Sequence, residues 1–353
     1  TTAMLSYLLV ENGKDPSFLV GGIPRDYGKS FRFGQGPDFV VEGDEYDSAF
    51  FDKRPKFIHY RPEVAVLTSL EFDHADIYDD LDDYKSAYFS LIDKMPERCL
   101  LVACDDYRHV REVSERARCE VVHYGLGNGD GWRAEKAGSS DGKTVLELYR
   151  DGKRAGKLKS PLPGDHNVAN LLAVVAVAER LDLKIPRDLL ALEKFGGIAR
   201  RMEVRGVSAG VTVIDDFAHH PTEVQSTVQA AREQYPESQL VAVFEPRTNT
   251  SRRSFFQERY ADSFTGADRV AVVPPYGIDD IAEEDRFDSS RLVRELTDKG
   301  LSARYFAGVT EVVDDLARTV PDGGVVLVMS NGAFGNIHDK LIKALRSREE
   351  AQE

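Results

Sequence analysis

Two short apolar runs in the first quarter of the chain each lead into a group of acidic residues. Residues 39–41 read as a strand that ends at Glu42, and residues 64–67 read as a second strand, followed within a few residues by His74 and Asp76. In an open α/β sheet, ligands bind just beyond the carboxyl ends of the strands. The pattern therefore predicts that carboxylates and an imidazole converge at two neighbouring strand ends, where they could hold a hard cation such as Mg²⁺. A solvated acidic loop is the alternative interpretation.

Short β-rich runs alternate with helical periods along the whole chain, which predicts an α/β architecture in two parts. The first part, residues 1–203, should contain a central, mostly parallel sheet, and the second, residues 204–353, should be a Rossmann-like domain. The expected strands are residues 39–42, 64–67, 100–103, 120–124, 211–214, 240–244, 270–273 and 325–329. The expected helices are residues 1–13, 84–94, 108–118, 167–181, 222–233, 289–299, 311–318 and 337–346. Asp151-Gly152 predicts an antiparallel hairpin added at the sheet edge.

Composition disfavours several classes of protein. Of the 353 residues, 42% are hydrophobic and 30% are charged, which is ordinary for a globular protein with a substantial core. The formal net charge of −14 disfavours nucleic acid or an anionic membrane as the main partner. No apolar run approaches the roughly 20 residues that a membrane-spanning helix requires. Three cysteines without metal-ligand spacing, Cys99, Cys104 and Cys119, favour a reducing cytoplasm.

A polar segment opens the alanine- and leucine-rich helix expected at residues 167–181. Asp165 could cap this helix, which is the interpretation that spacing alone favours. Alternatively, His166, Asn167 and Asn170 could present imidazole and amide groups to a base or a ribose. The sequence leaves both interpretations open.

Polar motifs also follow strands in the second part of the chain. Residues 215–221, Asp-Asp-Phe-Ala-His-His-Pro, lie between a strand and a helix, and Pro221 suits the first turn of that helix. Residues 245–253 combine three arginines with hydroxyl groups, a set that suits a carboxylate-bearing substrate. Residues 330–336 form a glycine-containing turn that could bind an anion or could serve only as a tight turn.

Two adjacent arginines, Arg200 and Arg201, lie near the expected junction of the two parts. A guanidinium at this point could reach phosphates, because it pairs with phosphate oxygens bidentately. A basic pair on the surface is the alternative.

Together these segments resemble the Mur ligase superfamily of ATP-dependent amide-forming enzymes. The motifs that carry the resemblance are residues 41–54, 70–76, 200–206, 215–221, 245–253 and 329–335, so it covers essentially the whole chain. Phe50-Phe51-Asp52-Lys53-Arg54 is similar to the branch that acts on a murein peptide instead of free L-alanine. The resemblance implies a central ATPase domain over residues 1–203 and a Rossmann-like C-terminal domain over residues 204–353.

The resemblance also implies roles for individual residues. Glu42 and His74 match Mg²⁺-binding positions and, with Arg201 and His219, make up the implied catalytic set. Asn167, Asn170, Arg201 and Asp216 match positions that contact the nucleotide. Arg247, Asn249 and Arg252 match positions that hold the incoming peptide. Ser69 stands where the family usually carries asparagine.

By resemblance, the reaction would join UDP-N-acetylmuramate to L-alanyl-γ-D-glutamyl-meso-diaminopimelate with ATP and Mg²⁺, in cytoplasmic peptidoglycan recycling. The protein would act as a monomer or weak homo-oligomer. The family further implies an N-terminal domain and a phosphate-binding loop upstream of Thr1, whose Thr1-Thr2 is similar to the end of that loop. The alternatives are a UDP-N-acetylmuramate–L-alanine ligase or another Mur-type ligase, a metal-dependent hydrolase, and an inactive nucleotide-binding fragment.

Overall fold

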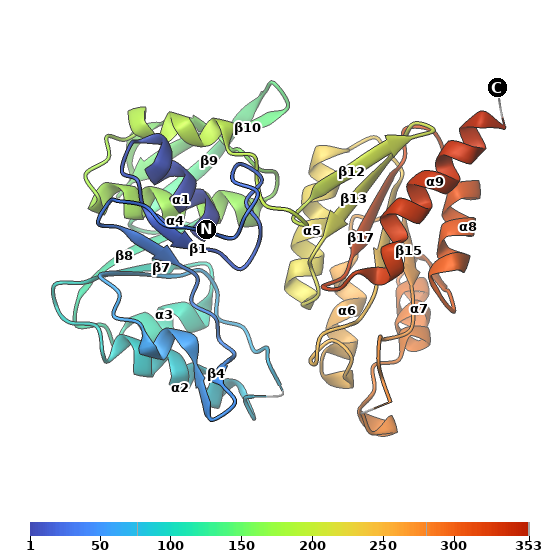
Figure 1. The fold of residues 1–353 in the computed structure, drawn as a ribbon, viewed down its shortest axis with the longest axis horizontal. Helices are drawn as coiled ribbons and strands as arrows, with labels where there is room; N and C mark the ends of the chain where they lie inside the picture. Colours follow the sequence, from blue (N-terminus) through green and yellow to red (C-terminus); the bar gives the residue numbers. More distant parts are fainter. Residues whose placement is uncertain (76, 280, 352–353) are drawn as a thin grey trace. The chain divides into compact units, whose positions relative to one another are not determined.

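The chain divides into two compact α/β units in the computed structural model, which describes residues 1–75, 77–279 and 281–351 (Figure 1). Unit 1 spans Thr1–Ala199 and unit 2 spans Arg200–Glu353. Each unit has its own six-stranded sheet, in which parallel pairs predominate, as the alternating pattern predicted. Asp76, part of the second acidic group, lies outside the described residues.

The main sheet of unit 1 has the strand order β11-β10-β9-β8-β7-β6. Its strands are β6 (Val64–Leu67), β7 (Leu100–Cys104), β8 (Glu120–Gly125), β9 (Trp132–Ser140), β10 (Lys143–Arg150) and β11 (Lys153–Lys159). The strands from β6 to β9 pair in parallel, and β9, β10 and β11 pair antiparallel. The predicted hairpin is confirmed, because Asp151 and Gly152 both have positive φ angles, 49° and 74°, in the turn between β10 and β11.

A second, three-stranded sheet in unit 1 has the order β2-β1-β3, and a separate hairpin follows it. These strands are β1 (Ser17–Leu19), β2 (Phe31–Arg32), β3 (Phe39–Val41), β4 (Asp47–Ala49) and β5 (Asp52–Pro55). The prediction that the strand before Glu42 neighbours β6 in one sheet is therefore wrong. β3 pairs in parallel with β1, a three-residue strand whose pattern is too short to signal a sheet of its own.

The helices of unit 1 pack around a core to which the chain's first helix contributes. They are α1 (Thr2–Glu11), α2 (Leu81–Ile92), α3 (Arg108–Ser114) and α4 (Asp165–Arg180), with shorter 3₁₀ helices at Lys56–His59 and Arg187–Lys194. α1 and α4 share this core with β7, β8 and β10. The prediction that Asp165 caps α4 is wrong: Gly164 holds the cap position with φ 87°, and Asp165 pairs with Lys136 at 2.7 Å.

Unit 2 has the strand order β12-β13-β17-β14-β15-β16, in which only β12 is antiparallel. Its strands are β12 (Glu203–Ser208), β13 (Val211–Asp216), β14 (Leu240–Phe244), β15 (Arg269–Val272), β16 (Ser302–Tyr305) and β17 (Val325–Met329). Its helices are α5 (Pro221–Gln234), α6 (Gln257–Ser263), α7 (Ser289–Asp298), α8 (Val309–Thr319) and α9 (Ile337–Glu350), with short 3₁₀ helices at Ser254–Phe256, Glu283–Asp285 and Phe334–Asn336. α8 and α9 bury their apolar residues on one face of the sheet. Among the described residues, no helix of either unit combines the length and apolarity that a membrane crossing demands.

The three cysteines are buried, and none forms a disulfide. Cys104, at the end of β7, is 1% exposed, and burial raises the pKa of its thiol to about 11. Because the thiolate is the reactive form, a buried thiol with a raised pKa is chemically inert near neutral pH. The structure therefore gives these residues a packing role.

Candidate active site

Glu42 directly follows β3, and its carboxylate is hydrogen-bonded to the backbone of the loop after the neighbouring strand, β1. Its Oε2 atom accepts a hydrogen bond from the Gly21 N–H at 2.8 Å. The fit is close, since a Cβ added at position 21 would lie 2.9 Å from Oε1. Glu42 is nevertheless solvent-exposed. The structure therefore offers a carboxylate that is fixed in position and still accessible to a cation.

His74 sits in a tight turn after β6 and faces a carboxylate that the sequence did not assign to it. Its φ angle is 55°, and its backbone N–H donates to Asp73 Oδ1 at 2.7 Å. Its Nε2 atom lies 4.0 Å from Glu45 Oε2. A carboxylate behind the imidazole is the usual arrangement for metal-bound histidines, because it orients the ring. That Glu42 and His74 share a Mg²⁺ ion stays a prediction, because their strands belong to different sheets of unit 1.

Glu45 is itself positioned by two tyrosines from the segment that follows His74. Tyr88 donates its hydroxyl proton to Glu45 Oε1 at 3.0 Å, and Tyr78 donates to the Glu45 carbonyl oxygen at 2.7 Å. Burial is the main cause that raises the pKa of the Glu45 carboxyl above its ordinary value. This support could not be predicted from the sequence, because it depends on contacts between segments far apart in the chain.

Among the residues that the structure describes, no three His, Cys, Asp or Glu side chains gather in a cluster that could hold a metal ion. A cation at Glu42 and His74 would therefore need oxygen ligands from water or from a bound phosphate. This is the usual situation for Mg²⁺, which keeps several waters and binds proteins through few side chains.

Asn167 and Asn170 lie one turn apart at the start of α4. Asn170 Oδ1 accepts a hydrogen bond from the Thr1 hydroxyl at 2.6 Å. The Asn167 amide donates to the Pro163 carbonyl at 2.7 Å and lies 3.0 Å from His166 Nε2. The structure thus brings the two asparagines to one helix end, with Thr1 beside them. Their contact with a nucleotide stays a prediction.

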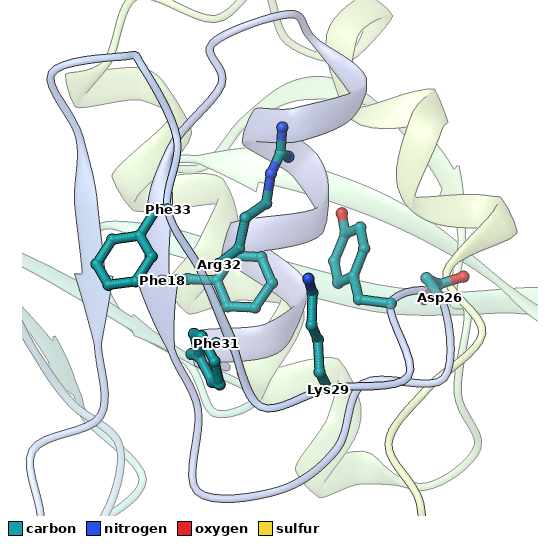
Figure 2. A pocket seen from close by; sticks show the side chains of 7 residues that line it. Phe18, Asp26, Lys29, Phe31, Arg32 and Phe33 are labelled. Atoms are coloured by element: carbon teal, nitrogen blue, oxygen red, sulfur yellow. The ribbon is translucent and has the colours of Figure 1, made fainter.

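A cavity of about 570 Å³ lies elsewhere in unit 1, beside β1 and β2 (Figure 2). Its lining residues are Phe18, Asp26, Tyr27, Lys29, Phe31, Arg32 and Phe33. Arg32 pairs with Asp15, and the Tyr27 ring packs 5.1 Å from the Phe18 ring. No residue that the sequence predicted for the site is among these lining residues.

In unit 2, the polar motifs leave the carboxyl ends of three adjacent parallel strands. β13 and β14 both pair with β17, and Asp216, Phe244 and Met329 lie in register across the sheet. The segments that follow these strands therefore begin side by side. This confirms the prediction that the motifs of unit 2 follow strands of one sheet, at the edge where α/β proteins bind ligands.

Asp216 is buried at this edge, and backbone groups engage its carboxylate. It accepts hydrogen bonds from the N–H groups of Met202 at 2.7 Å and Ala218 at 2.8 Å. The Thr227 hydroxyl donates to it at 3.3 Å, and burial raises its pKa. These contacts fasten the turn after Arg201 to the end of β13. A ribose contact by Asp216, which the resemblance implies, stays a prediction.

The two adjacent arginines have different surroundings. Arg200 donates hydrogen bonds to the carbonyl oxygens of Ser330 and Gly332, at 2.5 and 2.8 Å, and lies 3.3 Å from the buried carboxylate of Asp215. The side chain of Arg201 is 47% exposed, and its nearest carboxylate partner is Glu223 at 3.9 Å. Arg200 is therefore a structural clamp on the turn after β17, and Arg201 is the arginine available to a ligand.

The two histidines have different contacts: His220 caps a helix, and His219 contacts a carboxylate. His220 caps α5, accepting from the Thr222 N–H at 3.3 Å, and Pro221 occupies the first helical turn as predicted. The Nδ1 atom of His219 lies 3.3 Å from Glu223, which also accepts from the backbone N–H of His219 at 3.1 Å. Glu223 thus contacts both Arg201 and His219, which could not be predicted from the sequence.

The predicted peptide-binding residues gather around one loop after β14. Arg252 donates to Asn249 Oδ1 at 2.7 Å and also to the Gly277 carbonyl oxygen. Arg247 lies 3.5 Å from Glu245, whose carboxylate also accepts from the Ser330 hydroxyl at 2.5 Å. Two guanidinium groups and an amide therefore lie close together, a set that suits carboxylates of a substrate.

Replacing Asp215 with asparagine is expected to flatten the acid dependence of unit 2 stability. Burial alone raises the pKa of Asp215, but His338 at 3.3 Å and the charges of Arg200 and Arg205 outweigh it, so the pKa is lowered overall. A lowered folded-state pKa means that the ionised group stabilises the fold above its ordinary pKa and loses this contribution as pH falls. Denaturation midpoints measured from about pH 6 to about pH 2 would show the loss in the parent chain.

Asp215→Asn should be less stable than the parent chain at neutral pH and should lose less stability on acidification. An equal loss in both proteins would contradict the assignment. Asp339→Asn is a suitable control, because Asp339 is 73% exposed and pairs with Arg205 at 3.7 Å.

Two family models match the chain. The Mur ligase middle domain matches residues 38–178, and the Mur ligase glutamate ligase domain matches residues 200–332. Residues 38–178 include Glu42, His74, Asn167 and Asn170. Residues 200–332 include Arg200, Arg201 and residues 245–253, the loop that carries Arg247.

Similar proteins and solved structures also belong to the Mur ligases. The chain is 34% identical to the UDP-N-acetylmuramate–L-alanyl-γ-D-glutamyl-meso-2,6-diaminoheptandioate ligase of Escherichia coli K12, over 99% of this chain and 74% of that protein. It is 32% identical to the UDP-N-acetylmuramate–L-alanine ligase of Desulforamulus reducens, over the same shares. A murein peptide ligase structure from Psychrobacter arcticus matches with TM-score 0.70 and 29% identity, over 98% of this chain and 74% of that one. Ligases for two different amine substrates are thus about equally similar.

Proposed function

Because the chain belongs to the Mur ligase family of ATP-dependent ligases, we propose that it joins UDP-N-acetylmuramate to a murein tripeptide, L-alanyl-γ-D-glutamyl-meso-diaminopimelate. The observation that carries this choice of substrate is the β4–β5 hairpin. Its tip and second strand hold Phe50 to Arg54, the segment that resembles the peptide-using branch. Arg54 and Asp52 form a close pair there, 2.7 Å apart, and both phenylalanines are more than 90% exposed.

The proposed reaction forms an amide in two steps. The terminal phosphoryl group of ATP passes to the lactyl carboxylate of the sugar nucleotide, which gives an acyl phosphate and releases ADP. The amine of the L-alanyl residue then attacks the acyl carbon, and inorganic phosphate leaves from the tetrahedral intermediate. Holding the amine and the acyl phosphate together makes the attack effectively unimolecular, which can contribute several kcal/mol.

Each part of the site has a role in this proposal. Glu42 and His74 would hold Mg²⁺, which would neutralise charge on the phosphates. Asn167, Asn170 and Asp216 would bind the nucleoside, and Arg201 would bind its phosphates. His219 and the Arg247, Asn249 and Arg252 group would hold the carboxylate-bearing peptide. Exclusion of water from the acyl phosphate would protect it from hydrolysis.

With ATP, Mg²⁺ and UDP-N-acetylmuramate supplied, we expect kcat/KM for the tripeptide to exceed that for free L-alanine by at least about tenfold, on the order of 1.4 kcal/mol. The reason is that the tripeptide offers two further carboxylates to the arginine group, which L-alanine cannot do. Phosphate release measured for each amine would give the two values.

The second candidate, a UDP-N-acetylmuramate–L-alanine ligase, is favoured by the 32% identity to such an enzyme. Preference for free L-alanine in the same assay would establish it and reject the tripeptide. Turnover of either substrate without ATP would instead indicate a metal-dependent hydrolase.

A further inference from the structure

The guanidinium group of Arg247 lies over an aromatic ring, and the arginine side chain also lies close to a glycine. The central carbon of the guanidinium lies 3.6 Å from the centroid of the Tyr276 ring. On the side of the β17 turn, a Cβ added to Gly332 would lie 2.0 Å from Arg247 Nε. Any side chain at position 332 would therefore clash with Arg247 where it now lies, because this distance is far below van der Waals contact. Glycine at position 332 is therefore a condition for the position of Arg247.

The loop that carries Tyr276 is tied to the turn that carries Arg247. The Tyr276 N–H donates to the Pro246 carbonyl oxygen at 3.0 Å. Arg252 donates to the Gly277 carbonyl oxygen, one residue beyond the tyrosine. The Arg247 N–H donates to the Ser251 hydroxyl at 3.0 Å. These hydrogen bonds hold the segment that carries the ring beside the segment that carries the guanidinium.

Stacking in this way leaves the N–H groups at the edge of the guanidinium for oxygen acceptors: one donates to Glu245 at 3.5 Å, and the others can bind a ligand. Arg247 is 23% exposed, and Tyr276 is 56% exposed beside it. A planar guanidinium recognises a carboxylate through two parallel hydrogen bonds at its edge, so its orientation decides whether the pair can form. An aromatic face attracts the cation without using any of its N–H groups.

We propose that Tyr276 is a positioning residue for substrate binding, which holds Arg247 in the orientation that binds a carboxylate of the incoming peptide. The inference rests on the proposed function for the identity of the peptide. The stacking itself does not depend on that function, so the two are tested separately below. Tyr276 belongs to none of the motifs that suggested a site in the sequence.

The first experiment is an NMR measurement of the Arg247 Nε–Hε resonance in the full chain, assigned by its loss in Arg247→Lys. A ring stacked on the guanidinium shifts this resonance upfield. Tyr276→Phe should keep the shift, because the ring remains, and Tyr276→Ala should abolish it. An unchanged resonance in Tyr276→Ala would overturn the proposal. This measurement requires no substrate and no turnover.

The second experiment titrates the full chain with L-alanyl-γ-D-glutamyl-meso-diaminopimelate and follows binding by calorimetry. We expect Tyr276→Ala to raise the dissociation constant about tenfold and Tyr276→Phe to stay within twofold of the parent chain. Tyr305→Ala is the matched control, since Tyr305 is 40% exposed on β16 outside the site, and it should change nothing. Parent-like affinity in Tyr276→Ala would overturn the proposal.

Gly332→Ala provides a second variant that displaces Arg247, because the added Cβ would clash with the arginine side chain. It should weaken peptide binding at least as much as Tyr276→Ala, while ATP binding stays unchanged in both. Tight peptide binding with no ligation would refute the proposed function and leave the positioning role of Tyr276 supported.

Discussion

Glu42→Gln is expected to lower the rate of ligation by a hundredfold or more, on the order of 3 kcal/mol of charge stabilisation. The substitution is chosen because glutamine keeps an oxygen that can accept from the Gly21 N–H and removes only the negative charge. The folded state should therefore remain intact. His74→Ala should lose a similar amount, since the imidazole is the second proposed ligand of Mg²⁺. Steady-state rates at saturating ATP and a series of Mg²⁺ concentrations would provide the measurement.

A measurement of folding and a control variant make this test specific. Trp132 is the single tryptophan and is buried in unit 1, so its fluorescence reports whether that unit stays folded in each variant. Asp47→Asn is the matched control, because Asp47 lies on the nearby hairpin and pairs only with the exposed Lys53 among the pairs described. Its rate should stay within twofold of the parent rate. Near-normal ligation by both Glu42→Gln and His74→Ala would remove the metal assignment.

Arg200→Ala should destabilise unit 2 by about 3 kcal/mol, whereas Arg201→Ala should leave its stability almost unchanged. The first substitution removes hydrogen bonds to the carbonyl groups of the β17 turn and takes a counter-charge from buried Asp215. The second removes a half-exposed side chain. Hydrogen exchange of the β13 and β17 amides would measure the difference.

Per folded molecule, Arg201→Ala should lower activity more than Arg200→Ala does. Arg201→Ala should raise KM for ATP by about tenfold or more, because a charged hydrogen bond to phosphate is lost. Equal effects of the two substitutions on stability would contradict the separate roles, and an unchanged KM in Arg201→Ala would remove its phosphate contact.

The elements predicted correctly are those whose signal is local. β14 and β17 are continuous apolar runs, and nearly every residue of α4 from Val168 to Ala178 is apolar. The elements that the sequence missed lack such a pattern. β2 has two residues, and β16 reads Ser-Ala-Arg-Tyr, so neither shows a period that could be recognised.

In the candidate site too, features with a local sequence signal could be predicted and contacts between distant segments could not. That Asp216 and the Arg247 loop follow strands of one sheet could be predicted, because each motif directly follows an apolar run. Which groups pair with one another could not be predicted. The contacts of Glu45 with His74 and of Tyr276 with Arg247 join distant segments, and only the folded chain brings them together.

The burial of all three thiols makes the chain a convenient background for attaching reporter groups. Cys99, Cys104 and Cys119 are each less than 9% exposed, so a maleimide should react first with a cysteine introduced on the surface. One dye on unit 1 and another on unit 2 would then give a fluorescence-transfer ruler without removing any native residue. Energy transfer between the two dyes could then be measured with and without nucleotide and peptide.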